Sequence, residues 1–107
     1  MLPIFVLNQK VIDGGDMVGS ITPAAVDISG VTSYAVHAFW TGTPAGNIIV
    51  EGSNDNSNFV AVSTTAAGGA AGNVLVNVPN AAYRYVRVKY VLTSSTGVLN
   101  AYLSGKQ

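Results

Sequence analysis

Apolar residues recur at every second position along this chain, in short runs, and no stretch carries the spacing of an amphipathic helix. Residues 33–40 show the pattern most clearly. One face of that run carries Tyr34, Val36, Ala38 and Trp40. The other face carries Ala35, His37 and Phe39. Because side chains of an extended chain point alternately to opposite sides, this run is predicted to be a strand with the first face in the core.

Further strand candidates share the period of two and are separated by clusters of turn-forming residues. They lie at residues 4–7, 10–12, 17–21, 26–28, 47–52, 59–62, 74–78, 83–92 and 98–103. Gly14 and Gly15 are expected to interrupt the chain, and the Ala-, Gly- and Thr-rich residues 64–72 are expected to form a mobile loop. The spacing predicts an all-β fold, a single antiparallel β-sandwich of seven or eight strands.

The length of 107 residues suits one domain and is too short for two. We expect a single sandwich over residues 1–107, in which residues 1–30 contribute an extended N-terminal arm and edge strands. Residues 1–7 are apolar but far shorter than the roughly 20 residues of a membrane span, and they lack the basic start of a signal peptide. The chain is therefore expected to be complete from Met1, made in the cytoplasm and not secreted by this route.

The composition is apolar and nearly uncharged. Apolar residues make up 49% of the chain and charged residues 9%, with five basic and five acidic side chains that cancel. This balance provides no basic surface for nucleic acid, and the lack of cysteine excludes disulfides and thiolate metal sites. A neutral surface has little self-repulsion and favours a place in an assembly. A soluble monomer coated with Ser, Thr and Asn is the alternative.

Residues suited to catalysis are sparse. His37 is the one histidine, it has no acidic neighbour in sequence, and the five carboxylates lie on separate segments. Asp13 with Asp16, and Asp55 in its Asn- and Ser-rich turn, offer oxygen ligands for calcium, but ordinary Asx-turns account for both. We therefore predict no enzymatic activity, no catalytic residues, no metal site and no cofactor.

One basic and aromatic segment lies at residues 83–90. Arg84, Arg87 and Lys89 alternate there with three tyrosines. Aromatic and Arg side chains on a sheet can stack on bases or sugars, but alternation puts Arg84 on the opposite face from the other two cations. An amphipathic strand with Arg stems lying along apolar surface is the favoured interpretation.

Two motifs resemble known families. Residues 49–59 read IVEGSNDNSNF and residues 83–88 read YRYVRV. They resemble the hairpin and the following strand of discoidin-like (galactose-binding-like) β-sandwiches, which favours a jelly-roll or discoidin-like topology. In that arrangement Phe59 would pack against Val86 and Val88, together with either the Ile48 and Val50 face or the Ile49 face of the neighbouring strand. The family's long ligand-binding loops have no counterpart in so short a chain.

Residues 80–90 (NAAYRYVRVKY) and 93–106 (TSSTGVLNAYLSGK) are also similar to segments of small virion proteins of tailed bacteriophages. The similarity covers residues 31–106. It implies a virion structural protein, made in the host cytoplasm, that decorates or cements the capsid or belongs to the head, neck or tail. The implied partners are capsomers and sister copies, with a cyclic trimer as the expected oligomer and no nucleic acid or membrane partner.

Four residues are predicted to make these protein contacts: Phe5, Tyr85, Arg87 and Tyr102. Arg87 on a flat sheet face would pair with a carboxylate of a neighbouring subunit. The alternative function is a carbohydrate- or host-receptor-binding module, in which Trp40 and Tyr34 would stack on a sugar ring. Burial of those two rings in the core competes with that idea, because Val36 and Ala38 share their face.

Overall fold

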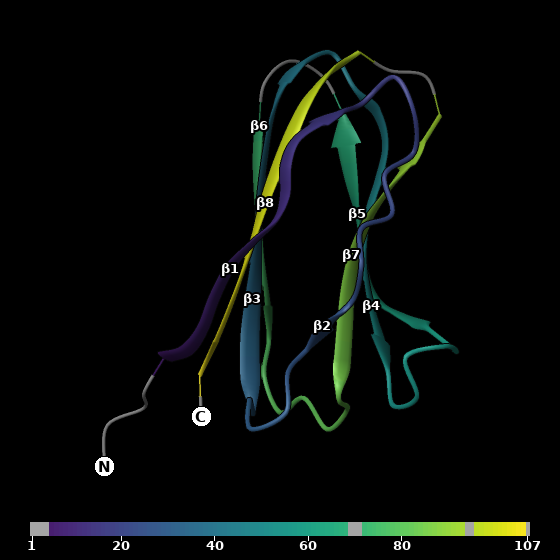
Figure 1. The fold of residues 1–107 in the computed structure, drawn as a ribbon. Coiled ribbons are helices and arrows are strands. Elements are labelled where there is room, and N and C mark those ends of the chain that lie inside the picture. The colour runs from purple at the N-terminus through teal and green to yellow at the C-terminus, as the bar shows by residue number, and fades with distance from the viewer. Residues whose placement is uncertain (1–4, 69–71, 94–95, 107) are drawn as a thin grey trace.

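The computed structural model describes residues 5–68, 72–93 and 96–106, with the backbone alone for residues 5 and 6. These residues form strands and turns, and none of them belongs to a helix long and apolar enough to cross a membrane. The strands are β1 (Phe5–Asp16), β2 (Val26–Asp27), β3 (Ser33–Gly42), β4 (Ala45–Ser53), β5 (Val60–Gly68), β6 (Gly72–Val78), β7 (Tyr85–Leu92) and β8 (Gly97–Lys106). The predicted antiparallel β-sandwich is confirmed, with eight strands in two layers (Figure 1).

The strands pair in a nested pattern, the first with the last and each later strand with the corresponding earlier one toward the middle of the chain. One sheet, called sheet A, has the order β1-β8-β3-β6, and the other, sheet B, has the order β2-β7-β4-β5. Strand β1 pairs with β8, β2 with β7, β3 with β6 and β4 with β5, each antiparallel. This nesting of first with last strand is the jelly-roll arrangement of two Greek keys.

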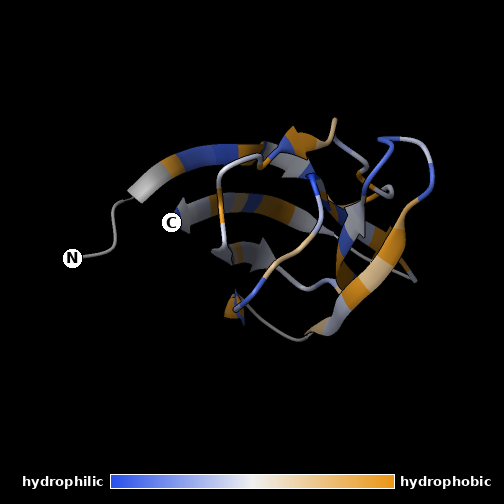
Figure 2. Ribbon diagram, turned by 90° about the horizontal axis from the view of Figure 1, so that it is seen from below, coloured by the Kyte–Doolittle hydropathy of each residue, from blue (hydrophilic) through white to orange (hydrophobic). Residues whose placement is uncertain are grey.

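The core lies between the two sheets and comes from the alternation along each strand. Tyr34, Val36, Ala38 and Trp40 are buried as predicted, between 1% and 6% exposed. The facing strands contribute Ile48, Val50, Val86, Val88, Tyr90, Leu99, Ala101 and Leu103. Figure 2 shows apolar and polar residues following one another along the strands of both layers. Each fully buried large aliphatic side chain stabilises the fold by about 1.5–3 kcal/mol.

A pair of tyrosines joins the layers near the end at which β7 begins. The hydroxyl groups of Tyr34 on β3 and Tyr83, just before β7, lie 2.6 Å apart, and their rings meet edge to face with centroids 6.2 Å apart. Burial raises the pKa of Tyr34, and the contact with Tyr83 raises it further. Tyr34 is therefore an un-ionised hydrogen-bonding group inside an apolar core.

Two stretches differ from the predicted elements. Of residues 64–72, expected in a loop, residues 64–68 belong to β5, Gly72 begins β6, and residues 69–71 lie outside the described part of the chain. The pairing of β5 with β4 runs from Thr64 opposite Ile49 to Gly68 opposite Ala45. The small side chains of residues 64–68 do not alternate between apolar and polar, so the sequence pattern does not indicate a strand there. The backbone of these residues nevertheless pairs with β4. Gly14 and Gly15 do not end β1: the strand continues to Asp16 through shifts of register, and Gly14 adopts a positive φ of 64°. Of the predicted strand 17–21, Ile21 alone makes a bridge, to Tyr90.

Candidate protein-binding surfaces

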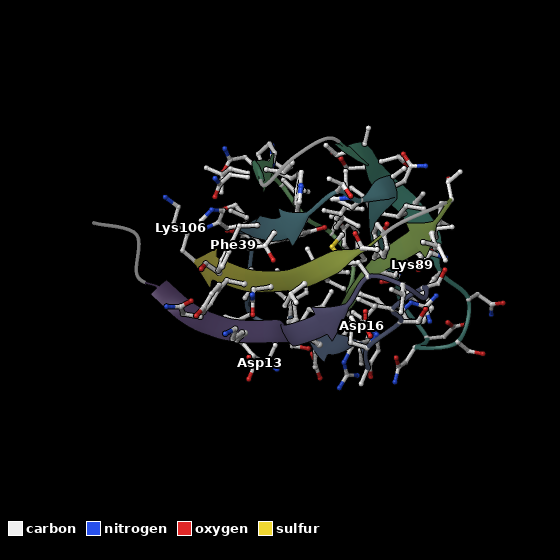
Figure 3. All side chains as sticks on the ribbon, turned by 90° about the horizontal axis from the view of Figure 1, so that it is seen from above. Asp13, Asp16, Phe39, Lys89 and Lys106 are labelled. Atoms are coloured by element: carbon white, nitrogen blue, oxygen red, sulfur yellow. The ribbon has the colours of Figure 1, made fainter. Side chains whose placement is uncertain are left out.

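The two outward faces of the sandwich carry the side chains that alternate away from the core. Figure 3 shows Phe39 and Lys89 on opposite flanks of the molecule, Phe39 outside sheet A and Lys89 outside sheet B. The two faces differ in chemistry, and each is built by the register of its sheet.

The outer face of sheet A has a cluster of three rings, His37, Phe39 and Tyr102, which we name the aromatic platform. Register places His37 directly opposite Tyr102, and Phe39 is two residues further along β3. The Phe39 and Tyr102 rings are nearly parallel, 17° between planes with centroids 6.2 Å apart, and the His37 ring lies 5.4 Å from Phe39. The platform therefore presents rings close enough together to be covered by one partner.

Polar and aliphatic groups border the aromatic platform. The Lys10 ammonium lies 5.5 Å from the Tyr102 ring centroid, and Asn73 Oδ1 lies 3.3 Å from His37 Nε2. Leu75, opposite His37 on β6, is 64% exposed. Lys10 is also bound to Asp13 at 3.0 Å, so its charge is offset locally. The face is thus apolar at its centre and polar but almost neutral around it.

The outer face of sheet B carries an ion cluster of Glu51, Arg87 and Lys89. Arg87 donates from Nε and Nη2 to Glu51 Oε1 at 2.9 and 2.7 Å, and Lys89 Nζ lies 3.1 Å from Oε2. The Arg87 guanidinium also lies 4.0 Å from the centroid of the Phe59 ring. One carboxylate and two cations leave the cluster with a net positive charge.

Opposing effects set the pKa of Glu51. Burial of this side chain, which is 9% exposed, would raise the pKa, but the ion pairs with Arg87 and Lys89 together outweigh burial and lower it. The carboxylate is therefore charged and fully engaged at neutral pH.

The expected packing of Phe59 against Val86 and Val88 is wrong, because Phe59 lies outside sheet B over Arg87 while those valines face the core.

The predicted contact residues do not form one patch. Tyr85 and Arg87 lie on β7, and Tyr102 lies on β8 in the other sheet. The backbone of Phe5 pairs with Lys106 at the start of β1, and its side chain is outside the described part of the chain. Arg87 binds Glu51 of its own chain, so its predicted pairing with a neighbour's carboxylate would involve the quarter of its side chain that remains exposed.

The rings expected to stack on sugar are in the core. Trp40 is 6% exposed and Tyr34 is 4% exposed, so neither offers a ring face to a ligand. Phe39, which lies between these positions on the same strand, was not among the predicted contact residues. The signal was present in the alternation, which put His37 and Phe39 on the face opposite Trp40.

The acidic positions considered for calcium are engaged within their own turns. The carboxylate of Asp55 accepts hydrogen bonds from the backbone amide and the side chain of Asn58, from the backbone amide of Ser57 and from the Ser53 hydroxyl. These hydrogen bonds, those from Asn58 first, lower the pKa of Asp55. Asp16 accepts from the Val18 amide, and Asp13 pairs with Lys10. Across the described ranges, no three His, Cys, Asp or Glu side chains gather as metal ligands would.

Comparison with known proteins gives structural relatives only. No protein-family model and no curated protein matches the chain. Among solved structures, the SPBc2 prophage-derived protein YomS is similar over 100% of this chain and 96% of its own, with a TM-score of 0.71 and 11% identity. At that identity the similarity establishes a shared fold.

Two further structures share the fold. The PBSX exported protein XepA matches 97% of this chain with a TM-score of 0.63 and 17% identity, and this chain spans 36% of its length. A protein from a structure described as Bacillus endospore appendages forming a family of disulfide-linked pili matches 98% of this chain and 89% of its own, with a TM-score of 0.59 and 15% identity.

Proposed function

We propose that this protein is a non-enzymatic structural component of a bacteriophage particle, which binds neighbouring proteins through the outer faces of its two sheets. The observation that carries the proposal is the aromatic platform on an almost neutral face. The fold shared with a prophage-derived protein over nearly the full length of both chains supports the phage setting. Fold alone does not assign function, so the faces must carry the argument.

The aromatic platform has the chemistry of an interface centre. Interfaces are enriched in aromatic side chains and depleted of charge at their centres, and a few such residues provide most of the binding energy. Phe39 and Tyr102 are half-buried and held in place by adjacent strands, so little conformational entropy is lost when a partner covers them. The Asn side chains around them supply hydrogen bonds at the rim.

The ion cluster makes the opposite face electrostatically complementary to an acidic partner surface. Its net positive charge suits a partner that places a carboxylate near Lys89, whose side chain is 24% exposed. Because Glu51 already holds Arg87 in a fixed geometry, the guanidinium is pre-organised for such a contact. The two faces therefore suit different partners on the two sides of one subunit.

A non-catalytic role fits the grooves of the described surface. One groove of about 300 Å³ is lined by ends of β3, β6 and β8, and its titratable groups are Tyr34 and Lys106. A second, of about 550 Å³, lies beside the β4–β5 turn with Asp55 and Tyr83. The residues that line these two grooves include neither the histidine nor a pair of carboxylates, the groups that acid–base catalysis commonly uses.

Copies of this chain would be held together without covalent bonds. The spore appendage relative belongs to pili described as disulfide-linked, whereas this chain contains no cysteine. Assembly must then rely on buried apolar area and backbone pairing.

We place the protein in the virion, as a capsid decoration or a minor head, neck or tail component that contacts capsomers and sister copies, after synthesis in the host cytoplasm.

The composition of purified particles tests this proposal. Particles banded by density and analysed by quantitative mass spectrometry should contain the protein at a fixed ratio to the major capsid protein, retained through washes at high salt. A protein absent from the particles, or one whose ratio falls with each wash, would contradict a structural role.

The second candidate function is a carbohydrate- or receptor-binding module. Its ligand site would be the aromatic platform, since Trp40 and Tyr34 are buried. Phe39 and Tyr102, with Asn73 and Asn100 nearby, combine ring faces with amides, as sugar recognition requires. A glycan array should then give hits that Phe39→Ala removes. No hit above background for the native protein would eliminate this candidate.

A further inference from the structure

Strand β6 forms an edge of sheet A that is open in the described part of the chain. It pairs with β3 alone, in unbroken register from Tyr34 opposite Val78 to Trp40 opposite Gly72. Its other edge has no strand partner among the described residues. The strand order places β6 at the opposite end of sheet A from β1. Unpaired backbone groups on such an edge are a template for another strand.

The other edges are protected by features that β6 lacks. Strand β1 carries Lys10, Asp13 and Asp16 and has three register shifts. Strand β2 is two residues long. Strand β5 has a register shift against Val50 and Glu51 that leaves Val62 as an extra residue, which bends the strand. Residues 72–78 contain neither a charged residue nor proline, so β6 is the regular and unprotected edge.

The sequence of β6 is symmetric about its centre. Residues 73–77 read NVLVN, a palindrome centred on Leu75. Two copies of this strand can pair antiparallel about a two-fold axis through Leu75. Asn73 then faces Asn77 of the second copy, Val74 faces Val76, and Leu75 faces Leu75. An interface between identical chains about a two-fold axis must be self-complementary in this way.

Side-chain exposure shows what such pairing would cover. Val74 and Val76 face the core but are only half-buried, since they stand at the open side of the sandwich. A second β6 would lay its own valines beside them. On the outer face Leu75 is 64% exposed and would meet its counterpart. Cross-strand pairs of this kind stabilise a sheet.

We propose that a second copy of this chain adds its β6 antiparallel to β6 of the first, with Leu75 on the two-fold axis, so that sheet A continues across two molecules. The inference rests on the proposed function only in that the protein binds sister copies. It gives a pair of chains as the assembling unit, in place of the trimer expected from the sequence.

The mass of the protein in solution is the first test. Light scattering over a range of concentrations should give the mass of two chains. Leu75→Lys places like charges directly opposite on the axis, so the dimer should be at least ~100-fold weaker. Val18→Lys, at a loop position 57% exposed, is the matched control and should dimerise normally. A monomeric native protein, or a dimer unaffected by Leu75→Lys, would overturn the proposal.

Single cysteines test the register, because the chain has none of its own. In Leu75→Cys the two thiols lie on directly opposed residues about 4.5–5.5 Å apart at Cα, within reach of a disulfide. In Asn73→Cys the thiols are four positions apart, about 13 Å along the strands, and should not bond. Adding Asn77→Cys to Asn73→Cys should restore cross-linking. Equal cross-linking of both single variants would contradict this register.

These results separate the inference from the proposed function. If the native protein is monomeric yet present at a fixed ratio in particles, the β6 interface fails and the structural role stands. If the protein dimerises through Leu75 but is absent from particles, the interface stands and the role in the virion fails.

Discussion

Individual polar contacts hold the apolar core in one arrangement. The clearest is the pair of hydroxyl groups on Tyr34 and Tyr83, which connects β3 of one sheet to the start of β7 in the other. Tyr34 is 4% exposed, so its hydroxyl has little access to water and depends on this partner.

Tyr83→Phe should lower the free energy of unfolding by roughly 1–3 kcal/mol, because it leaves the buried Tyr34 hydroxyl without a partner. Urea unfolding followed by circular dichroism measures the change. Tyr34→Phe added to Tyr83→Phe should recover part of the loss, and Tyr102→Phe on the outer face is the control. Equal effects of Tyr83→Phe and Tyr102→Phe would show that the contact contributes nothing.

Glu51→Gln should cost roughly 1–3 kcal/mol, because it leaves the Arg87 and Lys89 cations close together without their shared carboxylate. Chemical unfolding provides the measurement. Arg84→Ala is the matched control, since it removes one ion pair with Asp27 whose side chains are 57% and 44% exposed. The Arg84 variant should unfold almost as the native protein does.

Acid should destabilise the protein over a defined range. The hydroxyl and amide of Ser29, and then Arg84, lower the pKa of Asp27 to about 2 from an ordinary value of 3.8. The unfolded chain therefore binds a proton more readily than the folded one, and the stability due to Asp27 is present above pH 4 and lost as the pH falls from about 4 to about 2. Thermal unfolding across this range should show a shallower pH dependence in Asp27→Asn. An unchanged slope would contradict the assignment.

At the scale of the elements, the join between β3 and β8 depends on a glycine. Gly97 has a φ of +137°, and a Cβ there would overlap the carbonyl oxygen of Thr41. Gly97→Ala should therefore destabilise the fold by more than about 1 kcal/mol. Gly68→Ala on β5 is the control, because a Cβ at Gly68 meets no atom within 4 Å. Comparable melting temperatures of the two variants would disprove this requirement.

The sequence predicted the elements that bury large side chains and missed those that do not. Residues 33–40 and 83–92 alternate strongly, and both are strands close to the predicted bounds. Strand β5 beyond Ser63 consists of Thr, Ala and Gly, so its pairing with β4 provides the order that its side chains do not encode. The end of β1 beyond Gly14 is likewise ordered by its pairing with β8, which continues after a register shift.

The surface was predicted less well than the core, for a physical reason. Alternation states which residues point outward but not which outward residues become neighbours. Phe39 and Tyr102 are 63 positions apart in sequence and meet because β3 pairs with β8. Likewise, Glu51 and Arg87 meet because β4 pairs with β7. The sheet order that creates both contacts depends on long-range pairing, which one sequence does not specify.

At the scale of the whole molecule, the described residues form two outward faces with unlike chemistry and, at β6, an edge that is regular and uncharged. The aromatic platform and the net positive ion cluster lie on opposite sides, and β6 lies at the end of sheet A. Such a unit can contact a different neighbour in each direction. Contacts in several directions are what the proposed structural role requires.

Binding of the purified protein to particles assembled without it tests this account most directly. In co-sedimentation, the native protein should saturate at a fixed ratio, and Phe39→Ala and Tyr102→Ala should each weaken binding about 10-fold or more, as truncation at an interface centre does. Val91→Ala, on the other sheet, should leave binding to this site unchanged. No saturable binding, or equal binding by the native protein and both platform variants, would contradict the account.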